Sequence, residues 1–300
     1  MQARESQVTP LVSPPVTLAV REVGERTAET HVLLLHGFPD DQRMWEPVVE
    51  RLPRDWHVAT MDNRGAGSSS RPTSRSSFVL AMLVEDVIAV LDETVPVGEQ
   101  VHLVGHDWGS TLGWDVVAAS TWDPRLEDRL ASYTSVSGPP LDHLASRSHG
   151  WRGRWRMLPQ LLHSWYVVLF LLPRLPELNW RFGQGPLRRL MRRLDPTIEE
   201  LPWGREVAHN ATGSLELYRA NVVSRLANPV PWRTSLPVQL IELTRDTFVI
   251  QRSLEGLEAR CRNLSRVEVE SGHWLPRTDP DRLAGLVTDF VLVSTRSTDE

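Results

Sequence analysis

An aspartate stands between an apolar run and the expected start of a helix in the stretch VHLVGHDWGSTLGW, which begins at Val101. Gly105 and Gly109 flank Asp107 at equal spacing. Small residues in this arrangement favour a sharp strand-to-helix turn that holds the central side chain out as a nucleophile. A carboxylate nucleophile forms an ester, and water can cleave an ester. The stretch therefore predicts a two-step reaction with a covalent intermediate on Asp107.

Other expected strand ends supply the partners that a nucleophile needs, namely a base and donors for developing negative charge. The backbone N–H groups of Phe38, in HGFPD, and of Trp108 are the expected oxyanion-hole donors. Asp246 follows the apolar run in LIELTRDTFV, and His273 follows the run in VEVESGHW. The chain order nucleophile, acid, histidine at three strand ends predicts a catalytic triad of Asp107, Asp246 and His273.

Each triad member also has a simpler interpretation, because a lone aspartate or histidine at a strand end is usually a loop or capping residue. The joint order and position favour catalysis over three independent loop residues. His106 lies beside the nucleophile, but its side chain is expected to point away from Asp107 and to be structural. The remaining histidines lack the spacing of zinc sites, and we expect no metal.

Short β-branched or apolar runs alternate with amphipathic stretches along the chain, which predicts an α/β protein with a mostly parallel sheet flanked by helices. The expected strands are Val16 to Val23, His31 to Leu35, His57 to Met61, Gln100 to Val104, Ala131 to Val136, Pro237 to Leu243 and Ser265 to Glu270. Helices are expected from Phe78 to Leu91 and from Pro280 to Leu292.

The alternation stops after Ser137-Gly138-Pro139-Pro140 and resumes near Pro237. Helical periods without a strand signal predict a helical cap domain at 141–228, inserted into a core made of 1–140 and 229–300. The cap contains thirteen Arg against seven Asp and Glu, whereas the whole chain carries a net charge of −5. Two interpretations stay open: solvated charge on helix faces, or attraction for acidic amphiphiles or a membrane surface.

The overall composition sets broad limits. With 300 residues, 41% hydrophobic and 24% charged, the chain is typical of a globular protein with one large domain or a domain with an insertion. No run approaches the ~18 apolar residues of a membrane span, and the N-terminal residues do not resemble a secretory signal. We expect a cytoplasmic protein without integral membrane association or a nucleic-acid partner, and we allow for a homodimer. Cys261 is the only cysteine, which excludes an intramolecular disulfide.

Together, HGFPD, DNRGAGSS, GHDWGS and SGHW resemble the epoxide hydrolase branch of the α/β-hydrolase superfamily. SYTSVSGPPLDHL is similar to actinobacterial epoxide hydrolases of the mycobacterial type D kind, with only the hydrolase domain expected here. The resemblance implies the α/β-hydrolase fold with an all-helical cap after the sixth core strand. It also implies that Asp62 to Ser69 is a structural turn. A dinucleotide site at Gly65 and Gly67 is disfavoured because Ser70 replaces the third glycine.

The resemblance further implies a role for two tyrosines of the cap. Tyr166 in HSWYVVLFLLP and Tyr218 in LELYRANVV lie in contexts similar to the two lid tyrosines of epoxide hydrolases. Phenols of this kind can bind and protonate a departing epoxide oxygen. The alternative is that the rings merely pack the lid, because Leu215, Tyr218 and Val222 share one helical stripe.

The function expected from these features is hydrolysis of a hydrophobic epoxide by water to a vicinal diol through an ester on Asp107. Phe38, Trp108, Tyr166 and Tyr218 are the expected substrate contacts, and no cofactor is needed. One alternative is a haloalkane dehalogenase, which would use the same aspartate with Trp108 and Trp165 as halide donors. The other is a non-catalytic hydrolase fold that binds a small ligand.

Overall fold

A computed structural model describes residues 3–182, 189, 193, 195 and 206–296 of the chain. Its strands form one eight-stranded sheet in the order β1-β2-β4-β3-β5-β6-β7-β8. The β1–β2 and β2–β4 pairs are antiparallel, and the remaining pairs are parallel. The strands are β1 (Arg4–Val8), β2 (Leu18–Val23), β3 (His31–Leu35), β4 (His57–Met61), β5 (Val101–His106), β6 (Leu130–Val136), β7 (Thr234–Leu243) and β8 (Cys261–Val269). The predicted mostly parallel sheet is confirmed.

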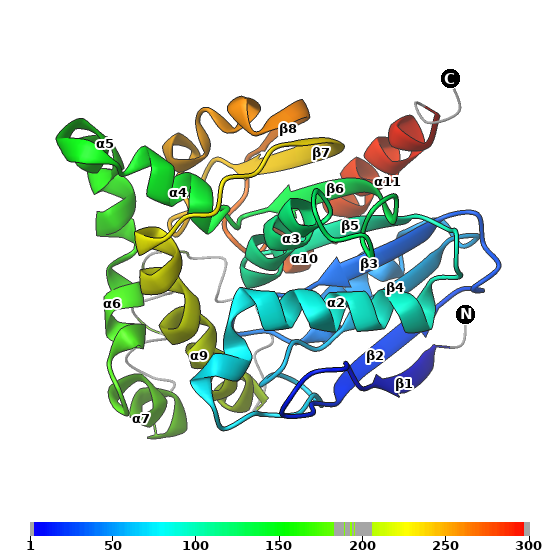
Figure 1. Ribbon diagram of the computed structural model, residues 1–300, viewed down its shortest axis with the longest axis horizontal. Helices are drawn as coiled ribbons and strands as arrows, with labels where there is room; N and C mark the ends of the chain where they lie inside the picture. The colour runs from blue at the N-terminus through cyan, green and yellow to red at the C-terminus, as the bar shows by residue number, and fades with distance from the viewer. Residues whose placement is uncertain (1–2, 183–188, 190–192, 194, 196–205, 297–300) are drawn as a thin grey trace.

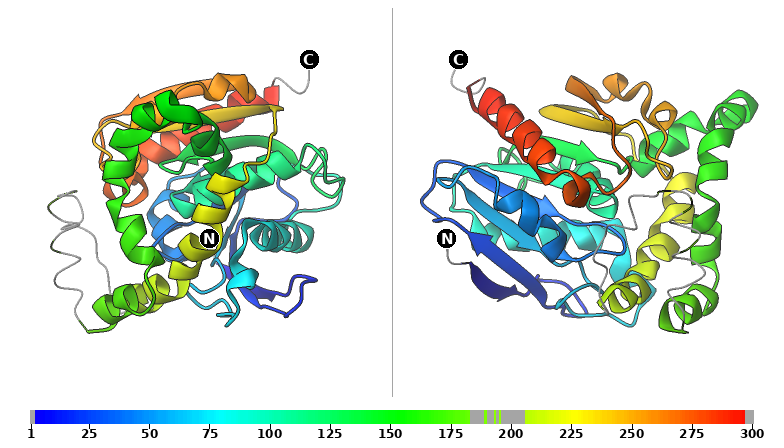
Figure 2. Two further views of the ribbon diagram at one scale, coloured as in Figure 1. Left: turned by 60° about the vertical axis from the view of Figure 1, so that its left-hand side comes forward. Right: turned by 180° about the vertical axis from the view of Figure 1, so that it is seen from behind.

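Helices cover both faces of this sheet (Figure 1, Figure 2). On one face lie α2 (Leu80–Thr94) and α3 (Trp108–Ala119), and on the other lie α1 (Glu46–Val49), α10 (Leu275–Thr278) and α11 (Pro280–Arg296). Four short 3₁₀ helices complete the described elements of the core: η1 (Gln42–Trp45), η2 (Arg75–Phe78), η4 (Gln251–Leu254) and η5 (Leu257–Ala259).

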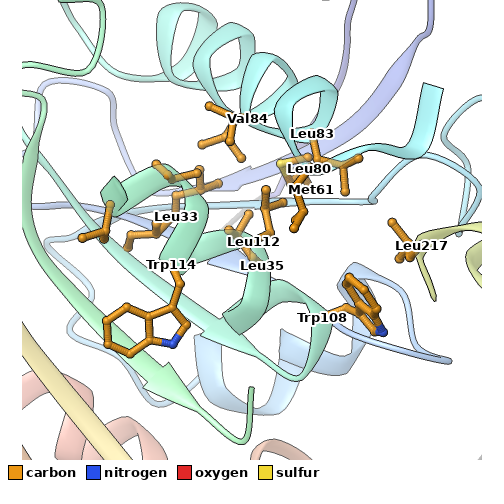
Figure 3. Packing of buried hydrophobic residues seen from close by; sticks show 14 of the residues in the cluster. Leu33, Leu35, Met61, Leu80, Leu83, Val84, Trp108, Leu112, Trp114 and Leu217 are labelled. Carbon is orange, nitrogen blue, oxygen red and sulfur yellow. The ribbon is translucent and has the colours of Figure 1, made fainter. Parts of the chain in front are cut away.

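Strand β3 shows why the sequence pattern of the core is continuous rather than alternating. All five residues of HVLLL are buried. Leu33 and Leu35 pack in the cluster with Leu112 on the α2 and α3 side (Figure 3). Val32 and Leu34 pack in the other cluster, under α1 and α11. A strand that is covered on both faces needs apolar residues at every position.

Several element boundaries differ from the predicted ones. Strand β1, RESQV, was not predicted because it is a largely exposed edge strand without an apolar run. It makes β6 the sixth strand. Helix α2 begins at Leu80, not at Phe78, because η2 ends at Phe78 and Val79 has extended backbone. Strand β8 begins at Cys261, earlier than predicted. Its first residues include the exposed polar Arg262 and Asn263, which give no strand signal.

The described residues between β6 and β7 form helices and no strand. They are α4 (Leu141–Arg147), α5 (Gly150–His163), α6 (Trp165–Leu171), α7 (Leu175–Phe182) and α9 (Glu206–Ala227). In Figure 1 this helical region lies at one end of the sheet. The domain boundaries at 141–228, and the split of the core into 1–140 and 229–300, stay a prediction. No helix in the described part of the chain is both long and apolar enough to cross a bilayer.

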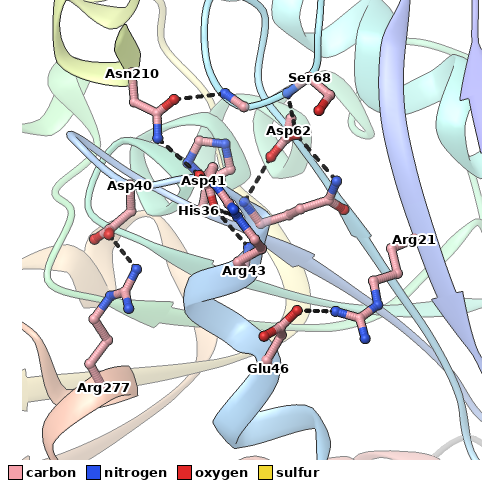
Figure 4. Close-up of polar contacts among 12 residues, drawn as sticks. Arg21, His36, Asp40, Asp41, Arg43, Glu46, Asp62, Ser68, Asn210 and Arg277 are labelled. Atoms are coloured by element: carbon pink, nitrogen blue, oxygen red, sulfur yellow. Dashed lines mark hydrogen bonds and ion pairs between the residues drawn. The ribbon is translucent and has the colours of Figure 1, made fainter. Parts of the chain in front are cut away.

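Helix α9 is bound to a loop of the core. Asn210 accepts a hydrogen bond from the backbone N–H of Gly67 (2.9 Å) and donates one to Asp41 (3.0 Å; Figure 4). The loop is held by Asp62, which accepts from the backbone N–H groups of Gln42 and Ser68 at 2.8 Å each. These contacts fix the cap helix over the sheet, beside the carboxyl ends of the parallel strands.

Candidate active site

The turn between β5 and α3 places Asp107 in an unusual backbone conformation. Its φ is 53° and its ψ is −119°, a region that residues with a side chain rarely adopt. The surrounding glycines explain how the turn closes. A Cβ at Gly109 would overlap the carbonyl oxygen of Leu35, and one at Gly138 would overlap that of Asp107. Only glycine allows the backbones to approach this closely, so the small residues of the sequence motif present Asp107 at the strand end.

The structure brings the three predicted triad residues together. His273 Nδ1 lies 2.9 Å from Asp246 Oδ2, and His273 Nε2 lies 3.5 Å from Asp107 Oδ2. The three residues follow β5, β7 and β8, which meet at the same edge of the parallel sheet. The histidine therefore bridges the two carboxylates through its two ring nitrogens.

Asp246 accepts hydrogen bonds from three other donors besides His273. Its Oδ1 accepts hydrogen bonds from the backbone N–H groups of Phe248 (2.7 Å) and Val249 (3.0 Å). Its Oδ2 accepts from the hydroxyl of Ser137 as well as from His273. Burial acts to raise the pKa of Asp246, but attraction to His273 and these hydrogen bonds outweigh it and lower the pKa. The carboxylate is charged and fixed in orientation.

The two carboxylates control the charge of His273. Burial acts to lower its pKa, but attraction to Asp246 and the contacts with Asp107 outweigh burial and raise the pKa to about 10. With both carboxylates charged, the imidazole is protonated at neutral pH. Because Asp107 supplies part of this effect, loss of the charge on Asp107 would lower the pKa of His273.

One of the two predicted oxyanion donors contacts Asp107 directly. The backbone N–H of Phe38 donates to Asp107 Oδ1 at 2.6 Å. Its loop is held by His36, whose Nε2 accepts from the backbone N–H of Asn63 at 2.9 Å. The other predicted donor belongs to Trp108, the first residue of α3. The amino end of a helix also favours negative charge.

The predicted lid tyrosines come from two cap helices, Tyr166 from α6 and Tyr218 from α9. Their ring centroids are 6.4 Å apart. The ring of Tyr218 lies 4.9 Å from that of Trp108 and 5.4 Å from that of Phe38. The cap thus brings Tyr218 against the two residues whose N–H groups are the predicted oxyanion donors, and Tyr166 lies beside Tyr218.

Both phenols keep their protons. Burial is the main cause that raises the pKa of Tyr166, and the charge of Asp107 adds to it. Burial likewise raises the pKa of Tyr218, with smaller contributions from Asp107 and Tyr166. The charge of Asp107 thus acts on two neutral phenols, and a phenol can give its proton to a strongly basic oxygen.

Aromatic rings surround the two tyrosines. Phe170 lies 5.5 Å from Tyr166 and 5.1 Å from Tyr218, while Phe248 lies 5.4 Å from Tyr166, all between ring centroids. Trp180 contacts the ring of Phe38 at 6.0 Å. These surroundings suit an apolar substrate and strengthen electrostatic interactions by excluding water.

Two residues of the site, Ser137 and Asp195, were missed by sequence reasoning. Ser137, with φ of 53°, directly follows β6 at the same sheet edge, and that position is the signal that could have found it. Asp195 accepts a hydrogen bond from the backbone N–H of His273 at 2.9 Å, and no motif marked it. His106 Nε2 lies 2.9 Å from the carbonyl oxygen of His273. That contact is to the backbone, so His106 supports the histidine loop.

The part of the chain that the structure describes has no group of three or more His, Cys, Asp or Glu side chains placed to hold a metal ion. The absence of a metal or cofactor from the reaction stays a prediction.

In this parallel sheet, a strand-to-helix turn presents a carboxylate beside a histidine that contacts a second carboxylate. This arrangement defines a class of α/β proteins built around a nucleophile turn. A sequence model described as the alpha/beta hydrolase fold matches residues 30–280. The chain therefore belongs to the α/β-hydrolase fold family, as the motifs predicted.

Relatives with assigned names narrow the resemblance. The chain is 34% identical over 300 residues to probable oxidoreductase EphD of Mycobacterium tuberculosis, covering 95% of this chain and 49% of that protein. It thus spans about half the length of that relative. Epoxide hydrolase 3 of Mus musculus is 27% identical over 266 residues, covering 84% of this chain and 68% of that protein.

Solved structures share the fold. The crystal structure of Bacillus megaterium epoxide hydrolase in complex with an inhibitor matches with a TM-score of 0.74 and 23% identity, over 92% of this chain and 97% of that chain. The predicted fold class and the predicted resemblance to epoxide hydrolases of the α/β-hydrolase superfamily are confirmed.

Proposed function

We propose that this protein is an epoxide hydrolase that converts a hydrophobic epoxide and water to a vicinal diol through an ester on Asp107. The observation that carries the proposal is a pair of neutral phenols, the half-buried Tyr166 and the buried Tyr218, near the Asp107 carboxylate that also faces His273. An epoxide oxygen departs as an alkoxide and needs an acid beside it. The names of the epoxide hydrolase relatives support the same reaction.

In the first step, Asp107 Oδ2 attacks one epoxide carbon and the bond from that carbon to the ring oxygen breaks. The departing alkoxide takes a proton from Tyr166 or Tyr218, and a phenolate remains. The N–H of Phe38 holds Oδ1, which becomes the carbonyl oxygen of the ester. Oδ2, on the side of His273, is therefore the attacking oxygen.

The proton balance between the two steps follows from the change in charge at Asp107. Once the carboxylate is an ester, the pKa of His273 falls, whereas the new phenolate is a strong base. Transfer of the imidazolium proton to the phenolate, through solvent, restores both phenols and leaves His273 neutral. His273 is then ready to act as a base.

In the second step, neutral His273 takes a proton from water, and the hydroxide attacks the carbonyl carbon of the ester. The oxyanion forms on Oδ1, within reach of the Phe38 N–H and beside the amino end of α3, where the Trp108 N–H lies. Collapse breaks the bond between the carbonyl carbon and Oδ2. The diol leaves with Oδ2 and takes the remaining proton of the attacking water from the new carboxylic acid, so Asp107 is again a carboxylate and His273 is again protonated.

A substrate panel and tyrosine variants test this proposal. Purified protein mixed with diverse epoxides and haloalkanes should release diol and no halide. Tyr166→Phe or Tyr218→Phe should slow ester formation roughly a hundredfold, because each phenol acts as a general acid. The double variant should be nearly inactive. Tyr133→Phe is the matched control, since Tyr133 is buried in the core against Ser110, and it should keep the rate of ester formation.

The same panel decides the alternatives. A dehalogenase would release chloride or bromide and would not need the phenols. The exposed position of Trp165 on α6 disfavours it as a buried halide donor. If no compound of the panel gives diol or halide, the result would favour the non-catalytic ligand-binding interpretation. Full activity of the double tyrosine variant on epoxides would refute the acid role.

A further inference from the structure

Large apolar side chains are exposed along one face of α5 in the cap. Trp155 and Leu162 are 68% and 65% exposed, and Leu158 is also exposed. Their spacing places all three on one helix face. Met157 and Gln160 lie on the opposite, buried face. The helix is thus anchored on one side and presents an apolar stripe on the other.

Helix α6 follows α5 at the outer edge of the cap (Figure 1, Figure 2), and exposed apolar side chains also lie on α6 and on Leu172 directly after it. Val168 is 65% exposed, and Trp165 and Leu172 are also exposed. Phe170 of the same helix is buried. We call the residues Trp155, Leu158, Leu162, Trp165, Val168 and Leu172 the outer cap face. An exposed apolar surface of this extent marks an interaction site.

The charge of the surrounding cap identifies the kind of partner. Residues 141–228 contain thirteen Arg against seven Asp and Glu, in a chain with a net charge of −5. The sequence of α5 places Arg152, Arg154 and Arg156 among its apolar residues. Amphipathic helices that combine arginine with exposed Trp and Leu lie in the headgroup region of bilayers. A second copy of the chain would bring two basic caps together, whereas anionic lipid would neutralise them.

We propose that the outer cap face docks on the surface of a bilayer that contains anionic phospholipid. Docking there would place the membrane beside the candidate active site. Gln160 of α5 bonds the backbone of Phe248 (2.8 Å) and Ile250 (3.0 Å), in the loop that follows Asp246. Trp165 packs edge to face with Tyr166 at 6.4 Å between ring centroids. An apolar substrate dissolved in the bilayer would then enter next to the catalytic residues.

Vesicle binding tests the proposal without any measurement of catalysis, so its failure is distinct from failure of epoxide hydrolysis. The full chain is mixed with phosphatidylglycerol vesicles or with phosphatidylcholine vesicles, and the bound fraction is measured by flotation. We expect binding to phosphatidylglycerol that weakens as salt rises, because salt screens the arginines. Trp155→Ala with Leu162→Ala should lower the partition coefficient roughly tenfold or more.

The matched control is Trp122→Ala, because Trp122 is 69% exposed on another part of the surface. It should change the partition coefficient by less than about twofold. Circular dichroism checks the fold of each variant. If the double variant does not fold, the vesicle binding of the single variant Leu162→Gln tests the proposal instead. Absence of binding to phosphatidylglycerol, or unchanged binding of a folded outer-cap-face variant, would overturn the proposal. A third result would also overturn the proposal: the protein self-associates, the double variant abolishes this self-association, and no vesicle binding is found. The outer cap face would then pair two copies of the chain.

Discussion

The charge of His273 is expected to depend on Asp107, and replacing Asp107 with Asn isolates that dependence. The imidazole Nε2 lies 3.5 Å from Asp107 Oδ2, and the side chains are 3% and 14% exposed. At that distance, Coulomb's law gives about 1 kcal/mol at a water-like dielectric of ~80 and about 5 kcal/mol at ~20. Removing the charge should therefore lower the pKa of His273 by about 1 to 3.5 units.

Titration of isotope-labelled histidine by nuclear magnetic resonance measures this shift. The His273 signal is assigned as the one missing from His273→Gln. From a pKa of about 10, the signal in Asp107→Asn should move to a midpoint between about 6.5 and 9. Asp142→Asn is a matched control, because Asp142 is a buried carboxylate that binds the backbone N–H of Val230 instead. It should leave the midpoint unchanged.

The raised pKa also has a definite sign for stability. The contribution of protonated His273 is full below the ordinary pKa of 6.5 and is lost as the pH rises through about 10. In Asp107→Asn the contribution of protonated His273 to stability should be lost at lower pH than in the wild type. The free energy of unfolding, measured with denaturant at a series of pH values, would show this shift. A His273 midpoint that stays within about half a unit of wild type in Asp107→Asn would refute electrostatic coupling between the two residues.

Substitutions at three residues, His273, Ser137 and Asp195, probe the same site. His273→Gln should still form the ester but not hydrolyse it, so mass spectrometry should find one substrate added to the peptide that contains Asp107; a variant that turns over without an adduct would contradict the assigned base. Ser137→Ala removes one of four donors to Asp246 and should slow ester hydrolysis roughly tenfold in single-turnover kinetics, with ester formation preserved. Asp195→Ala leaves the backbone N–H of His273 without this acceptor. It should lower the free energy of unfolding by about 1 to 3 kcal/mol and should also lower kcat. Asp195→Asn keeps an acceptor oxygen and should retain most of the stability and most of kcat. Equal kcat for the two Asp195 variants would show that the contact does not position His273.

The main strands could be predicted from the sequence because their burial leaves a plain pattern. The last four residues of β3, VLLL, are all apolar since both faces of the strand are covered. The edge strand β1 escaped prediction because RESQV packs little of its surface. The turn at Asp107 was predictable for a different reason: close backbone contacts demand glycine at Gly105 and Gly109, and glycine is visible in a sequence.

Contacts of the cap could not be predicted in the same way. A helical stripe through Tyr218 fits lid packing as well as catalysis, and only the resemblance to epoxide hydrolases selected the second interpretation. Asp195 reaches His273 through a backbone N–H, which carries no sequence signal of its own. Such pairs depend on how two distant segments meet in space, and local periodicity holds no information about that meeting.

A single turnover in heavy-oxygen water tests the central claim most directly. With enzyme in excess over an epoxide, the diol should take its new oxygen from Asp107, and the label from water should enter the Asp107 carboxylate. Mass spectrometry of the diol and of the Asp107 peptide reads both outcomes from one reaction. Label in the first-turnover diol, with none in Asp107, would show that water opens the ring directly and would contradict nucleophilic attack by Asp107.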